Sequence, residues 1–114
     1  MNKKEVGDLA EDLAVKFLEN QGYKIIERNF RFKNFGEIDI IALKKNLINF
    51  VEVKSLTEES EFIPEFHFSS KKYKKIEKIA SFYANKFNYS NWIISLITVV
   101  LENSKINYYE NIKI

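Results

Sequence analysis

The order of apolar and polar positions along the chain predicts two helices and five strands. Apolar residues recur at three- and four-residue spacing over residues 5–21, and again from Ser69 or Ser70 to about Phe87, which is typical of a buried helix face. Short runs rich in β-branched and aromatic residues predict strands over residues 23–32, 36–43, 47–54, 92–101 and 105–112. This order, α-β-β-β-α-β-β, predicts a single α/β domain over residues 1–114, with a mixed five-stranded sheet flanked by helices.

Two of these strands are expected to form a hairpin at the centre of the sheet. Only Lys44, Lys45 and Asn46 separate the two apolar runs, and asparagine tolerates the left-handed backbone that tight turns need. If Lys45 and Asn46 occupy the centre of the turn, Lys44 pairs with Leu47 and the later pairs follow in the same register. A shift of one residue would move every side chain to the other face, so the prediction depends on this turn.

In this register two carboxylates face each other. Asp39 lies opposite Glu52 and Glu37 lies opposite Lys54, with all four side chains on one face of the hairpin. Opposed carboxylates repel, and a divalent cation such as Mg²⁺ or Mn²⁺ would compensate. The alternative is a solvated face on which Glu37 and Lys54 form an ordinary ion pair. Apolar residues follow Asp39 on both faces of its strand, so its charge would be costly to bury without a partner, and this favours the cation.

Each helix adds one charged residue near its apolar stripe. Glu11 lies at the edge of the first stripe, so it either leans toward the sheet or remains a solvated boundary carboxylate. Lys72 lies in line with Ile76 and Tyr83, so it either snorkels past the helix end or points toward the acidic face of the hairpin. The opposite arc of this helix, either a solubilising face or a phosphate-contacting patch, carries Lys71, Lys74, Lys75 and Lys78.

Composition excludes several classes of function. The formal net charge of the 114 residues is +2, which by itself gives no argument for nucleic-acid binding. The chain has no cysteine for disulfides or thiolate metal sites, and its single histidine, His67, has no matching base-and-nucleophile set and is expected to be structural or exposed. No apolar run approaches the roughly 20 residues of a membrane span, and there is no signal peptide, so we expect a cytoplasmic protein without a membrane partner.

Two motifs of the central hairpin resemble those of a known family. Residues 36–39 read Gly-Glu-Ile-Asp and residues 50–54 read Phe-Val-Glu-Val-Lys, an Asp…Glu-x-Lys pattern. On an antiparallel hairpin after a first helix, this pattern resembles the PD-(D/E)xK, or restriction-endonuclease-like, superfamily, and more closely its YraN-like family of small bacterial proteins. The resemblance covers nearly the whole chain. Two departures are Ala10, where the family usually has glycine, and Leu56, where it usually has an arginine that could contact phosphate.

The resemblance implies a restriction-endonuclease-like core and a role for each site residue. The residues implied to hold Mg²⁺ or Mn²⁺ are Glu11, Asp39, Glu52 and, through its carbonyl, Val53. The implied catalytic residues are Asp39, Glu52 and Lys54, of which Lys54 would orient or help to activate the attacking water. Lys72 would face the scissile phosphate. The candidates for nucleic-acid binding are Arg31, because arginine forms a good phosphate fork, together with Lys71, Lys72 and Lys75.

Three functions remain to be compared. The first is a Mg²⁺-dependent endonuclease that hydrolyses phosphodiester bonds in DNA during repair, recombination or uptake, with a homodimer as one way to span a duplex. The second is a non-catalytic nucleic-acid-binding module that keeps the nuclease fold. The third is an interaction protein whose acidic loop, Glu58 to Glu65, docks a partner. The first ranks highest, because a module that only binds phosphates has no need for carboxylates that face one another.

Overall fold

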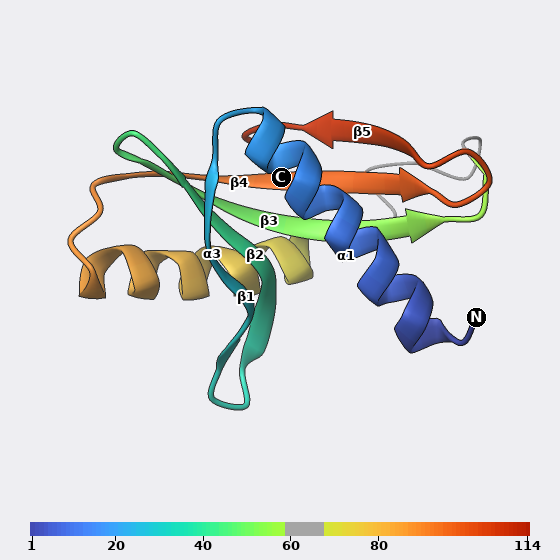
Figure 1. Cartoon of the computed structure of the whole chain (residues 1–114). Helices are drawn as coiled ribbons and strands as arrows, with labels where there is room; N and C mark the ends of the chain where they lie inside the picture. The colour runs from blue at the N-terminus through green and yellow to red at the C-terminus, as the bar shows by residue number, and fades with distance from the viewer. Residues whose placement is uncertain (59–67) are drawn as a thin grey trace.

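The computed structural model describes residues 1–58 and 68–114 and shows the predicted order of elements (Figure 1). The helices and strands are α1 (Lys3–Asn20), β1 (Lys24–Phe32), β2 (Gly36–Lys44), β3 (Leu47–Leu56), α3 (Ser70–Lys86), β4 (Asn91–Val100) and β5 (Lys105–Tyr109). The predicted α/β fold is confirmed. Within these described ranges, no helix is long and apolar enough to cross a membrane.

The five strands form one mixed sheet in the spatial order β1-β2-β3-β4-β5. Neighbouring strands are antiparallel except β3 and β4, which are parallel. Parallel neighbours need a crossover connection, and α3 lies in it. Figure 1 shows α1 in front of the sheet and α3 behind it. The run from Ile94 to Val100 is accordingly buried throughout, as its continuous apolar pattern predicts.

Each helix packs a layer of apolar side chains against one face of the sheet. We call these the α1 layer and the α3 layer. The α1 layer includes Ala10, Ala14 and Leu18 of the helix, packed against strand residues such as Ile40 and Val51. The α3 layer is more aromatic, and its buried members include Ile38, Phe50, Ile76, Ile79 and Tyr83. Both faces of the central strands are therefore dry, which makes any charge placed there costly.

Side-chain caps determine where the helices begin. The Asn2 side chain accepts a hydrogen bond from the Glu5 backbone N–H at 2.8 Å, and the Glu5 carboxylate accepts one from the Asn2 N–H at 3.1 Å. This reciprocal cap starts α1 two residues earlier than its apolar pattern predicts. Ser69 caps α3 by accepting from the Lys72 N–H at 3.2 Å, which confirms one of the two predicted caps.

The turn between β2 and β3 sets the register that the sequence predicts. Lys44 pairs with Leu47, and the following pairs keep the same register. One detail of the prediction is wrong, because Lys45, with a φ of 55°, takes the left-handed backbone and Asn46 does not. Some two-residue hairpin turns need a positive φ only at their first central residue, which here is Lys45.

The hairpin of β1 and β2 turns over near its middle. Residues two apart in a regular strand share a face, yet Ile38 packs in the α3 layer and Ile40 packs in the α1 layer. Asp39 lies between them, and Asn29, at the corresponding position of β1, has a left-handed φ of 52° that interrupts the alternation. Asp39 therefore lies where the strand passes from one layer to the other. Beyond this point the hairpin tip projects past the other strands (Figure 1).

Candidate metal and nucleic-acid site

The two acids of the central hairpin lie next to each other. The backbone N–H of Val53 donates to Asp39 Oδ2 at 2.8 Å, and the backbone N–H of Asp39 lies 3.4 Å from Glu52 Oε1. Each carboxylate is thus held by the strand that carries the other. The structure brings together the pair that the register predicts, and we call Asp39 and Glu52 the acidic pair.

The acidic pair consists of a buried Glu52 and a half-buried Asp39, with their carboxylates close together. Only 6% of the Glu52 surface is exposed. Burial raises the pKa of Asp39 to about 6, although the hydrogen bond from Val53 opposes the shift. Burial and then the neighbouring Asp39 charge raise the pKa of Glu52 to about 7, against the effect of Lys72. The site therefore favours whatever supplies positive charge, either protons or a cation.

Lys72 already supplies one positive charge from the neighbouring helix. Its ammonium Nζ lies 3.1 Å from Glu52 Oε2, and its side chain remains 53% exposed. Of the two predicted placements for Lys72, the structure shows the one toward the acidic face. The Lys72 ammonium would remain solvated without this contact, whereas Glu52, whose side chain is 8% exposed, would lose its counter-charge.

Glu11 leans toward the sheet, so its interpretation as a solvated boundary carboxylate is wrong. The residue is only 8% exposed. Glu11 Oε1 accepts hydrogen bonds from Arg28 Nε at 2.8 Å and from Asn29 Nδ2 at 3.1 Å. The same guanidinium also donates to Asp12 Oδ1 at 2.8 Å, and hydrogen bonds to these two acids raise the pKa of Arg28. The sequence analysis missed this role of Arg28 and Asn29.

Replacing Arg28 with methionine should lower the free energy of unfolding by about 2 kcal/mol, because it leaves Glu11 charged, nearly buried and held only by Asn29. The measurement is urea unfolding at neutral pH. Arg31→Met is the matched control. Arg31 is 71% exposed in its ion pair with Glu37, so its loss should change stability by less than about 0.5 kcal/mol. Equal effects of the two substitutions would contradict the assignment.

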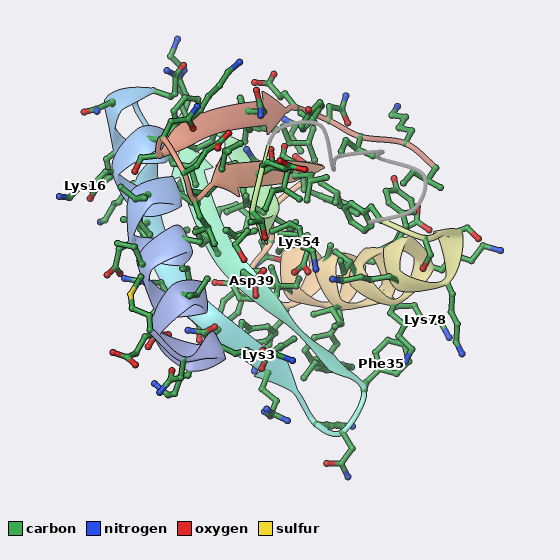
Figure 2. The ribbon with its side chains drawn as sticks, turned by 90° about the vertical axis from the view of Figure 1, so that its right-hand side faces the viewer. Lys3, Lys16, Phe35, Asp39, Lys54 and Lys78 are labelled. Atoms are coloured by element: carbon green, nitrogen blue, oxygen red, sulfur yellow. The ribbon has the colours of Figure 1, made fainter. Side chains whose placement is uncertain are left out.

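Two clefts meet at the acidic pair. The α3 cleft, of about 440 Å³, lies between the central hairpin and α3. The α1 cleft, of about 350 Å³, lies beside the first turns of α1. The residues that line both are Asp39, Val53 and Lys54. Because the two clefts share these residues, we call them together the groove. Figure 2 shows Asp39 and Lys54 between α1 and α3.

Lysine side chains line both clefts. Lys3 and Lys4 line the α1 cleft, and Lys72 and Lys75 line the α3 cleft. Lys75 was expected to point outward with the other lysines of its helix, but it belongs to the cleft. Acids line the flanks as well, with Asp8 and Glu11 in the α1 cleft and Glu37 in the α3 cleft, so both signs of charge occur along the groove.

Two other predicted site residues lie farther out. Arg31 Nη2 is 3.3 Å from Glu37 Oε2, so Glu37 pairs with Arg31 and not with Lys54 as the sequence analysis expected. The cause is the β1–β2 register, which puts Arg31 directly opposite Glu37. Lys71 is exposed on α3 and outside both clefts.

The donor atoms of the acidic pair fit a hard divalent cation only in part. Two carboxylates and the Val53 carbonyl are oxygen ligands of the kind that Mg²⁺ and Mn²⁺ prefer. Among residues 1–58 and 68–114, however, no three acidic or histidine side chains are grouped so that they could hold a metal ion. Glu11 is bonded to Arg28 and Asn29 and does not join the pair. A bound ion would therefore take its remaining ligands from water and substrate.

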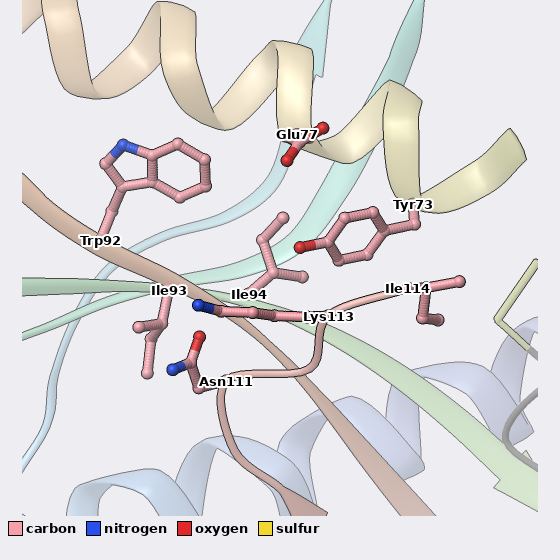
Figure 3. A pocket seen from close by; sticks show the side chains of 8 residues that line it. All are labelled: Tyr73, Glu77, Trp92, Ile93, Ile94, Asn111, Lys113 and Ile114. Atoms are coloured by element: carbon pink, nitrogen blue, oxygen red, sulfur yellow. The ribbon is translucent and has the colours of Figure 1, made fainter. Parts of the chain in front are cut away.

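Another cavity lies on the far flank of α3 (Figure 3). It has a volume of about 460 Å³ and is bordered by Tyr73 and Glu77 of α3, Trp92 of β4 and Lys113 near the chain end. One acid and one lysine give it no excess of either charge. Residues 59–67 lie outside the described residues. They include His67 and all of the predicted acidic loop except Glu58.

Comparison with known proteins places the chain in a family. The model of the uncharacterised protein family UPF0102 matches residues 10–101. A UPF0102 protein of Fervidobacterium nodosum is 48% identical over 97% of this chain and 83% of its own length. UPF0102 proteins of Clostridioides difficile and Aliarcobacter butzleri are 45% and 39% identical, over 97% and 96% of this chain and 98% and 96% of their own lengths. The chain therefore belongs to the UPF0102 family, which confirms the YraN-like family that its hairpin motifs predict.

Proposed function

We propose that this protein is a Mg²⁺- or Mn²⁺-dependent nuclease of the PD-(D/E)xK type that hydrolyses phosphodiester bonds in DNA. The observation that carries the proposal is the acidic pair, with Glu52 buried and Asp39 half-buried, at the junction of two clefts whose lining includes several lysines. Two adjacent carboxylates whose pKa values are raised by burial destabilise the fold when both are charged, so a purely structural role does not explain them. Such groups are found where a site must hold a cation or move a proton.

The residues of the groove supply complementary parts of the reaction. Asp39, Glu52 and the Val53 carbonyl would hold the ion, which when bound neutralises phosphate charge and lowers the pKa of a coordinated water. Lys54 lines both clefts beside the pair, where its ammonium can orient that water and stabilise charge that develops on the phosphate. Lys72, whose Nζ lies 3.1 Å from Glu52 Oε2, would contact a phosphate oxygen of the bound strand.

A second candidate is a DNA-binding module without catalysis. The contact between Lys72 and Glu52 favours it, because an ammonium group then satisfies one of the two acids without a metal. This candidate leaves Asp39 without a cationic partner of its own, which is the reason that we rank it second. It also predicts binding that survives Asp39→Asn.

The test is a cleavage assay on single-stranded, duplex and branched DNA with Mg²⁺ or Mn²⁺, and with a chelator as the blank. We expect cleavage of at least one substrate that requires the metal and is lost in Asp39→Asn. If no substrate is cleaved, or if Asp39→Asn cleaves like the wild type, the nuclease proposal is wrong. Salt-dependent binding without cleavage would then support the second candidate.

A further inference from the structure

Three phenylalanines form a partly exposed group where the hairpin tip meets α3. Phe35 lines the α3 cleft together with the acidic pair. The centre of its ring lies 6.4 Å from that of Phe32, in an edge-on arrangement. The centre of the Phe32 ring lies 4.4 Å from that of Phe82 on α3. We call these three residues the aromatic ledge. The ledge is thus continuous with the cleft that holds Asp39 and Glu52.

The ledge is exposed in a way that core aromatic residues of this protein are not. Phe50 and Phe68 are 0% and 1% exposed, whereas Phe82 is 43% exposed. Phe32 and Phe35 are half-buried. A cluster that served only to pack the hairpin tip would be expected to bury its rings, because each buried aromatic side chain gains free energy from the area it removes from water.

Lysine side chains surround the ledge. Lys78 Nζ lies over the Phe35 ring, 5.7 Å from its centre, and Lys33 Nζ lies over the Phe32 ring, 5.6 Å from its centre, so a base that stacks on either of these faces takes the place of an ammonium group. On α3, residues spaced by four, three and four positions share one stripe of the helix surface. The stripe that leads along α3 to the ledge consists of Lys71, Lys75, Lys78 and Phe82. Figure 2 shows Phe35 and Lys78 on the same side of Asp39.

We propose that the aromatic ledge binds unpaired bases of DNA by stacking, while the lysines of the α3 stripe hold the phosphates of the same strand. The substrate class is then DNA with a single-stranded segment beside the cleaved bond. This inference rests on the proposed function, because it places the cleaved phosphate at the acidic pair. Flat rings framed by ammonium groups are the combination that single-stranded nucleic acid requires, since every base offers a face for stacking. Paired bases inside a duplex offer no such face.

The test measures binding of fluorescent DNA of about 12 nucleotides, single-stranded or duplex, in chelator and at low salt. Phe35→Leu combined with Phe82→Leu keeps apolar side chains at the tip but removes two of the three rings, leaving that of Phe32. We expect it to weaken single-strand binding on the order of 10-fold and to leave duplex binding nearly unchanged. Phe35→Trp should preserve single-strand binding. Phe87→Leu is the matched control, because Phe87 is 49% exposed at the end of α3 and lines neither cleft, so it should bind as the wild type does.

The outcomes separate the ledge from the proposed nuclease. Unchanged single-strand binding in the double variant, or equal loss of single-strand and duplex binding, overturns the stacking role. Equal loss in Phe87→Leu also overturns it. If the rings matter for binding but no DNA is cleaved, the ledge stands and the nuclease fails. If Asp39→Asn abolishes cleavage while the double variant binds and cleaves normally, the nuclease stands and the ledge fails.

Discussion

Replacing Glu52 with glutamine should reduce the proposed Mg²⁺-dependent DNA cleavage roughly 10²- to 10³-fold while the protein stays folded. The amide removes one of the two adjacent charges that would hold the ion, and Mg²⁺ binds a neutral amide oxygen less well than a carboxylate. The fold should survive because Lys72, the partner of Glu52, is 53% exposed, so water can solvate its ammonium group when the carboxylate is gone. The measurement is the initial cleavage rate at a Mg²⁺ concentration that saturates the wild type.

Glu102→Gln provides the matched control for this substitution. Glu102 is exposed in the turn after β4, away from both clefts, and the chemical change is the same. Its cleavage rate should equal that of the wild type. A Glu52→Gln variant that cleaves as fast as Glu102→Gln would show that Glu52 is not needed to hold the ion, and the assignment of the acidic pair would be wrong.

In the absence of metal, the acidic pair should make the protein less stable as the pH rises. The folded-state pKa values of Asp39 and Glu52, about 6 and about 7, lie above the ordinary values of these groups. Between about pH 4 and about pH 7 the folded chain therefore binds more protons than the unfolded chain. The stabilising effect of these protons is complete below about pH 4 and is lost as the pH rises through about 6 and 7. We expect a loss on the order of 2 kcal/mol between pH 5 and pH 8.

The double variant Asp39→Asn with Glu52→Gln isolates this effect from the other acids of the chain. Urea unfolding in chelator should show that the wild type loses stability from pH 5 to pH 8 relative to the double variant. Added Mn²⁺ should restore wild-type stability at pH 8 and leave the double variant unchanged, because an ion that binds only the folded state stabilises it. Parallel pH profiles for the two proteins would contradict the raised pKa values.

The local sequence was sufficient to predict the acidic pair and to put Lys72 in line with the buried face of its helix, but it left open whether that lysine points to the acids or past the helix end. The pair depends on a two-residue turn at Lys45 and Asn46, whose register runs to Ile40 and Val51, the residues next to Asp39 and Glu52. Lys72 depends only on the helical period, which aligns it with the buried face of α3. In both cases the period of one strand or helix determined where the side chain lies. The left-handed residue of the turn is Lys45 and not Asn46, but this does not change the register.

Contacts between distant segments could not be predicted in the same way. Glu11 is buried because Arg28 and Asn29 arrive from β1, and the left-handed backbone of Asn29 breaks the alternation on which strand predictions depend. An asparagine within a strand was the one available signal, since asparagine tolerates this conformation. Lys75 lines a cleft because the hairpin tip reaches α3, and the helical period of α3 contains no information about that neighbour.

The change of face at Asn29 and Asp39 places the Asp39 carboxylate on the segment that joins the α1 layer to the α3 layer. The part of the hairpin farther from its tip packs between α1 and α3. The apolar side chains of the tip pack on α3 alone. If α3 moved relative to α1, the backbone of the hairpin would twist most at Asn29 and Asp39. Under the proposed function, a strand that displaced α3 would therefore also shift the Asp39 carboxylate.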